Sequence, residues 1–206
     1  GLSQAAVSGD FEYKLIDGGT AVEITSYRGS DGYVAIPSEI EGKPVTSIGD
    51  RAFAYRELTG SVTIPDSVTK IGEDAFRWNQ LTDVLLPDGL TDIGSGAFMD
   101  NMLTILTIPD SVKNIGDYAF SVNLLLHVTI PESVDKIGKG AFHWNPFKYK
   151  EHRTHPELGM SDYENPHELS IFGMPGSEAE RYAKSNGNQF VDISGNTWKY
   201  DAFLKP

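Results

Sequence analysis

The chain has 206 residues, of which 39% are hydrophobic and 22% are charged, a composition typical of a folded, soluble protein. Its formal net charge of −12 disfavours nucleic acid and anionic membranes as partners, because both are negatively charged, and favours basic or cationic ones. The sequence has no cysteine, which excludes disulfides and thiolate metal sites. No apolar run reaches the ~18 residues of a membrane span, so we expect no membrane insertion.

The first part of the chain predicts a hairpin. Residues 11–16 and 20–25 alternate as two strands would, and Asp17-Gly18-Gly19 between them is a turn signal. We therefore assign residues 1–30 to an N-terminal tail and a hairpin cap.

Residues 31–147 contain five copies of an Ile-Gly pair that is followed, three residues later, by Ala-Phe. The first two copies are 23 residues apart and the others follow at 22 residues. A fixed period of this length predicts a solenoid whose repeated Ile, Ala and Phe side chains form the core. The Gly of each pair predicts either a positive φ or a close approach of the neighbouring coil.

Each repeat also contains a short alternating segment that ends at a proline. We predict parallel strands on one face from these segments, since proline cannot donate to a ladder, with turns and short helical segments on the other face. The segments are 62–64, 84–86, 106–108 and 128–130. A recurrent asparagine predicts a ladder of hydrogen bonds inside the turns, at Asn79, Asn101, Asn123 and Asn145.

The period breaks after the fifth repeat. Residues 148–168 form an irregular insertion, and insertions in solenoids map to loops that often bind partners. Residues 169–193 predict a capping repeat with strands over 169–171 and 189–193 and a helix over roughly 178–185, which Ser177 and Glu180 begin with capping-box spacing and Asn186-Gly187 ends. Residues 194–206 form a tail.

The repeat resembles that of the BspA-type leucine-rich-repeat family of bacterial surface and secreted proteins. Residues 62–76 carry the strand-ending Ile-Pro, the Ile-Gly and the Ala-Phe, residues 36–49 look like the longer first repeat, and residues 171–183 look like the closing segment. Many members have Cys where this chain has the recurrent Asn. The resemblance implies a non-catalytic extracellular scaffold for adhesion or for protein or glycan recognition, with no catalytic residue and no cofactor.

Candidate contact residues lie at two places. Outward strand positions and aromatic or histidine residues at the insertion form the predicted binding set, which is Thr63, Leu85, Ile105, Thr107, His127, Thr129, Trp144, Tyr149, His152 and Tyr163. A column of Tyr55, Trp78, Asp100, Val122 and Trp144 follows the repeated Phe, and because aromatic residues do not fill it we expect local packing over the turn rather than ligand binding. Acidic residues after each proline predict turn capping by their carboxylates, at Asp66, Asp88, Asp110 and Glu132.

Two other interpretations stay open. A structural spacer of a surface protein would have no ligand. A metal-dependent enzyme would need His152, His155 and His167 to converge on one ion, although their spacing matches no catalytic metal motif, so we predict no metal site.

Overall fold

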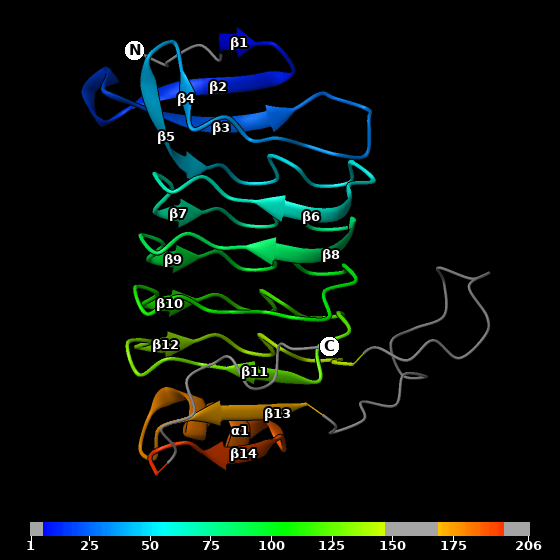
Figure 1. Cartoon of the computed structure of the whole chain (residues 1–206), viewed down its shortest axis with the longest axis vertical. Helices are drawn as coiled ribbons and strands as arrows, with labels where there is room; N and C mark the ends of the chain where they lie inside the picture. The colour runs from blue at the N-terminus through cyan, green and yellow to red at the C-terminus, as the bar shows by residue number, and fades with distance from the viewer. Residues whose placement is uncertain (1–5, 147–168, 196–206) are drawn as a thin grey trace, which may run out of the picture.

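A computed structural model describes residues 6–146 and 169–195, and every structural statement below concerns these residues. The chain forms a solenoid whose rungs stack along the long axis, with the N-terminal hairpin at one end and the only described α-helix at the other (Figure 1). The predicted leucine-rich-repeat solenoid is thus confirmed, but in the described repeats the face predicted to carry turns and short helical segments carries strands of a long sheet in place of the helical segments. No helix in the described part of the chain is long and apolar enough to span a bilayer.

The elements follow one another along the chain as short strands. They are β1 (Ala6–Ser8), β2 (Phe11–Ile16), the 3-10 turn η1 (Asp17–Gly19), β3 (Ala21–Tyr27), β4 (Glu39–Ile40), β5 (Lys43–Ile48), β6 (Thr59–Thr63), β7 (Lys70–Ile71), β8 (Gln80–Leu85), β9 (Asp92–Ile93), β10 (Asn114–Ile115), β11 (His127–Thr129), β12 (Lys136–Ile137), β13 (Ser170–Gly173), α1 (Glu178–Asn186) and β14 (Gln189–Asp192).

One long sheet runs through the molecule in the order β1-β2-β3-β5-β7-β9-β10-β12, with β4 paired to β5. Strands β5 to β12 of this sheet are parallel, and the Ile of each Ile-Gly pair lies beside the Ile of the next repeat. The predicted hairpin is confirmed, because β2 and β3 are antiparallel neighbours.

The second face of the solenoid includes the strands that end at proline, and we call this second face the sheet face. It consists of the parallel pair β6-β8 and the parallel trio β11-β13-β14. The strand predicted over 106–108 is wrong, because that segment makes only an isolated bridge between Thr107 and Thr129. On the β8 side, the hydrogen bonds to the preceding repeat come from residues before this segment, from Met102 N to Leu81 O and from Thr104 N to Thr82 O.

The repeated Phe residues form a continuous stack in the core. Neighbouring rings lie 4.8 to 5.5 Å apart with planes within 6° of parallel, and each ring is at most 2% exposed. Tyr27 stacks on Phe53 at 5.5 Å, and Tyr182 packs edge-on against Phe142 at 5.7 Å. The two caps therefore close the stack with tyrosines, whose hydroxyl groups find hydrogen-bond partners at the ends of the core.

The predicted asparagine ladder is confirmed. Asn101 Oδ1 accepts a hydrogen bond from Leu81 N at 3.1 Å, and its Nδ2 donates to the carbonyls of Phe76 at 2.9 Å and Phe98 at 3.2 Å. The same set recurs at Asn79, Asn123 and Asn145. Each buried Asn thus pairs backbone groups of two consecutive rungs that would otherwise lack partners.

The glycines of the Ile-Gly pairs are required by close packing of the coils. None of them has a positive φ, which rules out that alternative. A Cβ placed on Gly94 would lie 2.5 Å from the carbonyl carbon of Gly72, a distance at which the backbone itself would have to move.

The C-terminal cap differs from its prediction in one detail. Helix α1 begins at Glu178 and is capped at its C-terminus by Gly187 with φ 71°, as expected, but Ser177 makes no capping hydrogen bond and its buried Oγ lies beside Gly173. Glu180 instead accepts a hydrogen bond from Gly176 N at 2.7 Å. The neighbouring Lys184 ammonium and this amide hold the pKa of Glu180 below its usual value.

Candidate functional site

The sheet face brings six of the predicted contact residues into two columns. Thr63 lies opposite Leu85 in the β6-β8 pair, and Thr107 lies opposite Thr129. Ile105 and His127 precede Thr107 and Thr129 by two residues, and the residues between them, Leu106 and Val128, are buried, so burial alternates in both segments. All six are exposed or half-buried.

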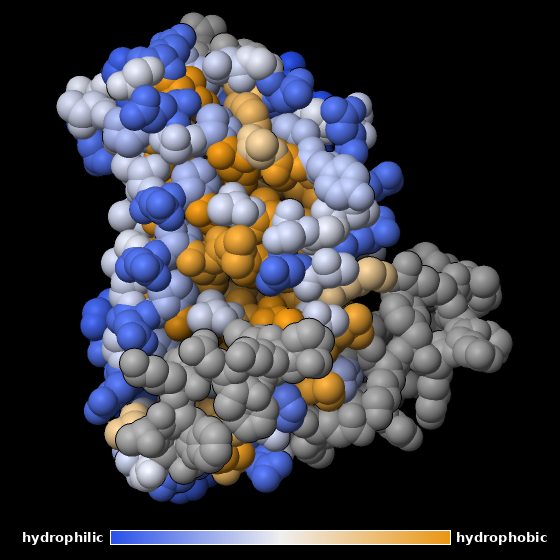
Figure 2. Space-filling view, in the orientation of Figure 1, coloured by the Kyte–Doolittle hydropathy of each residue, from blue (hydrophilic) through white to orange (hydrophobic). Residues whose placement is uncertain are grey.

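Leu85 and Ile105 are the apolar centre of this face. Leu85 is 54% exposed and Ile105 is 49% exposed, although both side chains are large and hydrophobic. A band of hydrophobic side chains runs along the middle of the molecule in Figure 2, with hydrophilic side chains on its flanks. Exposed apolar surface surrounded by polar side chains is typical of a protein contact surface.

One further residue of the sheet face, Phe172 of β13, was missed in the sequence. It lies in register with Thr129 and packs edge-on against His127 at 5.8 Å. The pairing of β13 with β11 places Phe172 beside an outward position, whereas Ser170, in register with His127, is buried. The irregular spacing before residue 169 hid this register.

The remaining candidates do not join the sheet face. Trp144 is half-buried in a turn and packs against His143 at 5.8 Å, so it belongs to the column of Tyr55 and Trp78. Tyr149, His152 and Tyr163 lie outside the described residues, as do His155 and His167. Within residues 6–146 and 169–195, no three His, Cys, Asp or Glu side chains are grouped so that they could hold a metal ion.

The acidic residues after the prolines do not cap their turns as predicted. The amide two residues further on donates to the proline carbonyl instead, as from Val68 N to Pro65 O at 2.9 Å and from Leu90 N to Pro87 O at 3.0 Å. These backbone hydrogen bonds close the turn without the carboxylate. The carboxyl-bearing residues are exposed, and they are Asp66, Asp88, Asp110 and Glu132.

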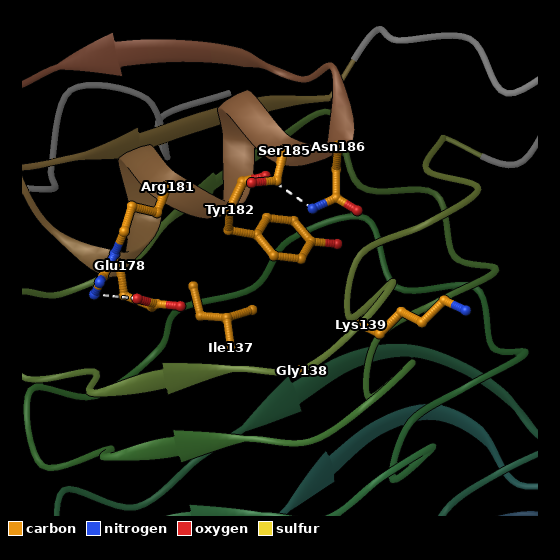
Figure 3. Close-up of a pocket in the computed structure, with 8 residues that line it drawn as sticks. All are labelled: Ile137, Gly138, Lys139, Glu178, Arg181, Tyr182, Ser185 and Asn186. Carbon is orange, nitrogen blue, oxygen red and sulfur yellow. Dashed lines mark hydrogen bonds and ion pairs between the residues drawn. The ribbon is translucent and has the colours of Figure 1, made fainter.

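A cavity of about 440 Å³ lies between the last repeat and α1 (Figure 3). Its lining consists of Ile137, Gly138, Lys139, Glu178, Arg181, Tyr182, Ser185 and Asn186. Tyr182 accepts a hydrogen bond from Phe142 N at 2.9 Å, and burial raises its pKa to about 12, so its hydroxyl stays protonated. Glu178 and Arg181 pair with each other, and the side-chain oxygen Oδ1 of Asn186 lies 2.9 Å from His143 Nε2. These contacts join the cap to the last repeat, and we assign them a structural role.

Comparisons with known proteins agree with the repeat geometry. Six copies of the BspA type leucine rich repeat region match residues 46–151, which is just over half of the chain. A comparison with curated protein sequences gave no match.

Solved structures of bacterial repeat proteins are similar to this one. A leucine rich repeat protein from T. pallidum is 28% identical over 82% of this chain and 71% of that chain, with a TM-score of 0.60. A leucine-rich repeat protein from Bacteroides ovatus is 30% identical over 66% of this chain and 38% of that chain, with a TM-score of 0.54. The pneumococcal vaccine antigen PcpA is 23% identical over 69% of this chain and 48% of that chain, with a TM-score of 0.52, which supports the fold alone. The chain thus spans less than half the length of the last two.

Proposed function

Because the chain belongs to the BspA type leucine rich repeat family, we propose that it is a non-catalytic binding scaffold, displayed or secreted by a bacterium for adhesion. We propose further that its sheet face contacts a protein partner. The observation that carries this proposal is that the large apolar side chains of Leu85 and Ile105 are about half exposed among the threonines of the sheet face.

The surrounding residues fit a protein contact. Interfaces place apolar side chains at the centre and polar side chains at the rim, where they exclude water from the centre. Leu85 and Ile105 are flanked by Thr63, Thr107 and Thr129, whose hydroxyls offer hydrogen bonds. The net charge of −12 favours a partner with a basic surface, because opposite charges steer association.

The test is direct binding of the folded chain to purified extracellular matrix and serum proteins on a solid support. We expect saturable binding to at least one of them, and we expect the double variant Leu85→Asp with Ile105→Asp to lose it. Leu15→Asp is the matched control, because Leu15 is 41% exposed but lies on β2 in the N-terminal cap. Unchanged binding by the double variant would remove the sheet face from the proposal.

The same experiment separates the scaffold from a spacer. A spacer would bind none of the proteins with or without the substitutions. Deleting residues 148–168 from the chain tests whether the insertion, which includes Tyr149, His152 and Tyr163, adds to binding, and elemental analysis for bound metal tests the enzyme alternative.

A further inference from the structure

Tyr55 and Trp78 form an exposed aromatic pair on the turns, apart from the sheet face. Each follows the core Phe of its repeat by two residues. Their ring centroids are 5.8 Å apart with an interplanar angle of 18°, and the residues are 62% and 51% exposed. A tryptophan and a tyrosine therefore stack on each other while most of their surface meets solvent.

The fold does not require aromatic residues at these positions. The next two repeats place Asp100 and Val122 there with the same left-handed backbone, at φ 59° and 56° against 58° and 57° for Tyr55 and Trp78. This conformation disfavours bulky side chains. Neither backbone geometry nor burial thus explains the aromatic pair.

Tyr55 stacks on one face of Trp78, and about half of the Trp78 surface remains exposed. The following rungs carry the shorter side chains of Asp100 and Val122 at this position. Trp144 is the next aromatic residue of the column, three rungs away, which is roughly 14 Å at the spacing of neighbouring strands. The aromatic pair is therefore separated from the rest of the column by two non-aromatic rungs.

Hydrogen-bonding groups lie in the same turns. The Asp74 carboxylate lies 3.6 Å from Arg51 Nε and 3.3 Å from an Arg77 terminal nitrogen. The Arg51 side chain is 70% exposed, so its remaining donors are open to a ligand. The guanidinium and carboxylate groups of such ion pairs offer planar hydrogen-bond donors and acceptors, while their opposite charges largely cancel.

We propose that Tyr55 and Trp78 are a carbohydrate-binding platform for a pyranose with an apolar face, such as a β-linked glucose or N-acetylglucosamine unit. In these sugars the ring substituents are equatorial, so the axial C–H groups form a flat apolar face that can stack on the exposed indole ring of Trp78. The polar groups of Arg51, Asp74 and Arg77 in the same turns are the candidate partners for the sugar hydroxyls. A protein partner would instead require the tryptophan to enter a desolvated pocket. This site is independent of the protein contact proposed for the sheet face.

The test is NMR titration of the intact chain with cellotriose and with chitotriose. We expect a saturable upfield shift of the axial ring protons of one of these sugars, because protons above an aromatic face are shielded by its ring current. Trp78→Val should weaken binding by roughly tenfold or more, and Tyr55→Val should weaken it less. Valine is chosen because the repeat already holds Val122 at this position, so the variants are expected to fold.

Two controls make the result specific. Tyr33→Ala removes a 70% exposed tyrosine outside the pair and should leave the shifts unchanged, as should Leu85→Asp with Ile105→Asp on the sheet face. The proposal is overturned if neither sugar gives an upfield shift at millimolar concentration, or if Trp78→Val, with the melting temperature of the wild type, gives the same shifts.

Discussion

The interior columns of the solenoid repeat one residue in every rung, whereas its outward columns change from rung to rung. Phe occupies the core position of all five repeats, and Asn occupies the ladder position of four. On the sheet face one column holds Thr63, Leu85, Thr107 and Thr129. On the turns, the column of Tyr55 and Trp78 continues with Asp100 and Val122. The periodic positions therefore build the stack, and both proposed contact sites lie where the period varies.

The difference has a physical cause. A core side chain must fit the identical side chain of the neighbouring rung, and interiors tolerate little change in volume. An outward side chain meets solvent, where most substitutions change stability by less than ~0.5 kcal/mol. The following predictions test how sharply the two kinds of column differ.

The largest effect is expected from Phe98→Ala. Phe98 is fully buried between Phe76 and Phe120, so truncation leaves a cavity and breaks the stack. We expect a loss of about 3–5 kcal/mol in the free energy of unfolding, measured by denaturant titration. A loss below about 1 kcal/mol would contradict a rigid Phe column.

The asparagine ladder should come next. Asn123→Ala leaves Leu103 N without its acceptor and removes one donor from the carbonyls of Phe98 and Phe120. We expect a loss on the order of 3 kcal/mol, because unsatisfied buried polar groups are costly. The exposed Asn114 is the control, because its side chain donates only to the Asp92 carboxylate, and Asn114→Ala should change stability by less than ~0.5 kcal/mol.

Alkaline pH should weaken the cap through Tyr182. Its pKa is about 12 in the folded chain against 10.0 ordinarily, so the hydroxyl is neutral in both states below pH 10, while between pH 10 and 12 the unfolded state ionises first. Stability should therefore fall as pH rises through this window, by about 2–3 kcal/mol from this residue. Denaturant titrations at pH 9 and pH 12 measure the fall. It should be smaller in Tyr182→Phe, and an equal fall in both proteins would argue against the buried hydroxyl.

Two glycine substitutions test how closely the neighbouring coils must pack. Gly94→Ala would bring a Cβ against the Gly72 backbone, and we expect a loss of about 1–3 kcal/mol or more in thermal unfolding. Gly89→Ala is the matched control, because its Cβ would meet only Asp66 O at 3.6 Å, an ordinary contact. Similar melting temperatures of the two variants would show that neighbouring coils can move apart at little cost in free energy.

The smallest effect is expected on the sheet face. Leu85→Thr with Ile105→Thr should change the free energy of unfolding by less than ~0.5 kcal/mol per site, because both side chains are about half exposed. Circular dichroism during thermal unfolding checks this. A large loss in the free energy of unfolding would mean that these residues stabilise the fold, which would argue against a role as a contact surface.

Local patterns were sufficient for most of the fold. The solenoid, the hairpin of β2 and β3, helix α1 and the asparagine ladder were all predicted, since each rests on spacing within one or two repeats. The strand at 106–108 and the Ser177 capping bond were wrong. Both depended on which hydrogen bonds neighbouring segments make in space, and sequence spacing does not specify these.

The candidate site was less predictable for the same reason. The sequence placed Thr63, Leu85 and Ile105 on an outward face, which alternation along a strand determines. It missed Phe172 because β13 pairs with β11 from outside the regular 22-residue period, so the spacing along the sequence does not give their register. It also gave Tyr55 and Trp78 only as members of a broken column, without their mutual stacking.

The sequence by itself determined the repeat, its length and the residues that face inward, because a 22-residue period can bury its apolar side chains only by stacking like on like. Only the tertiary structure decided how the Phe stack ends, with Tyr27 and Tyr182 as the closing rings, and why the Ile-Gly glycines are needed. It also decided which outward side chains meet across rungs. Those contacts join residues from different repeats or caps, and their distances follow from how the coils pack rather than from any pattern within one coil.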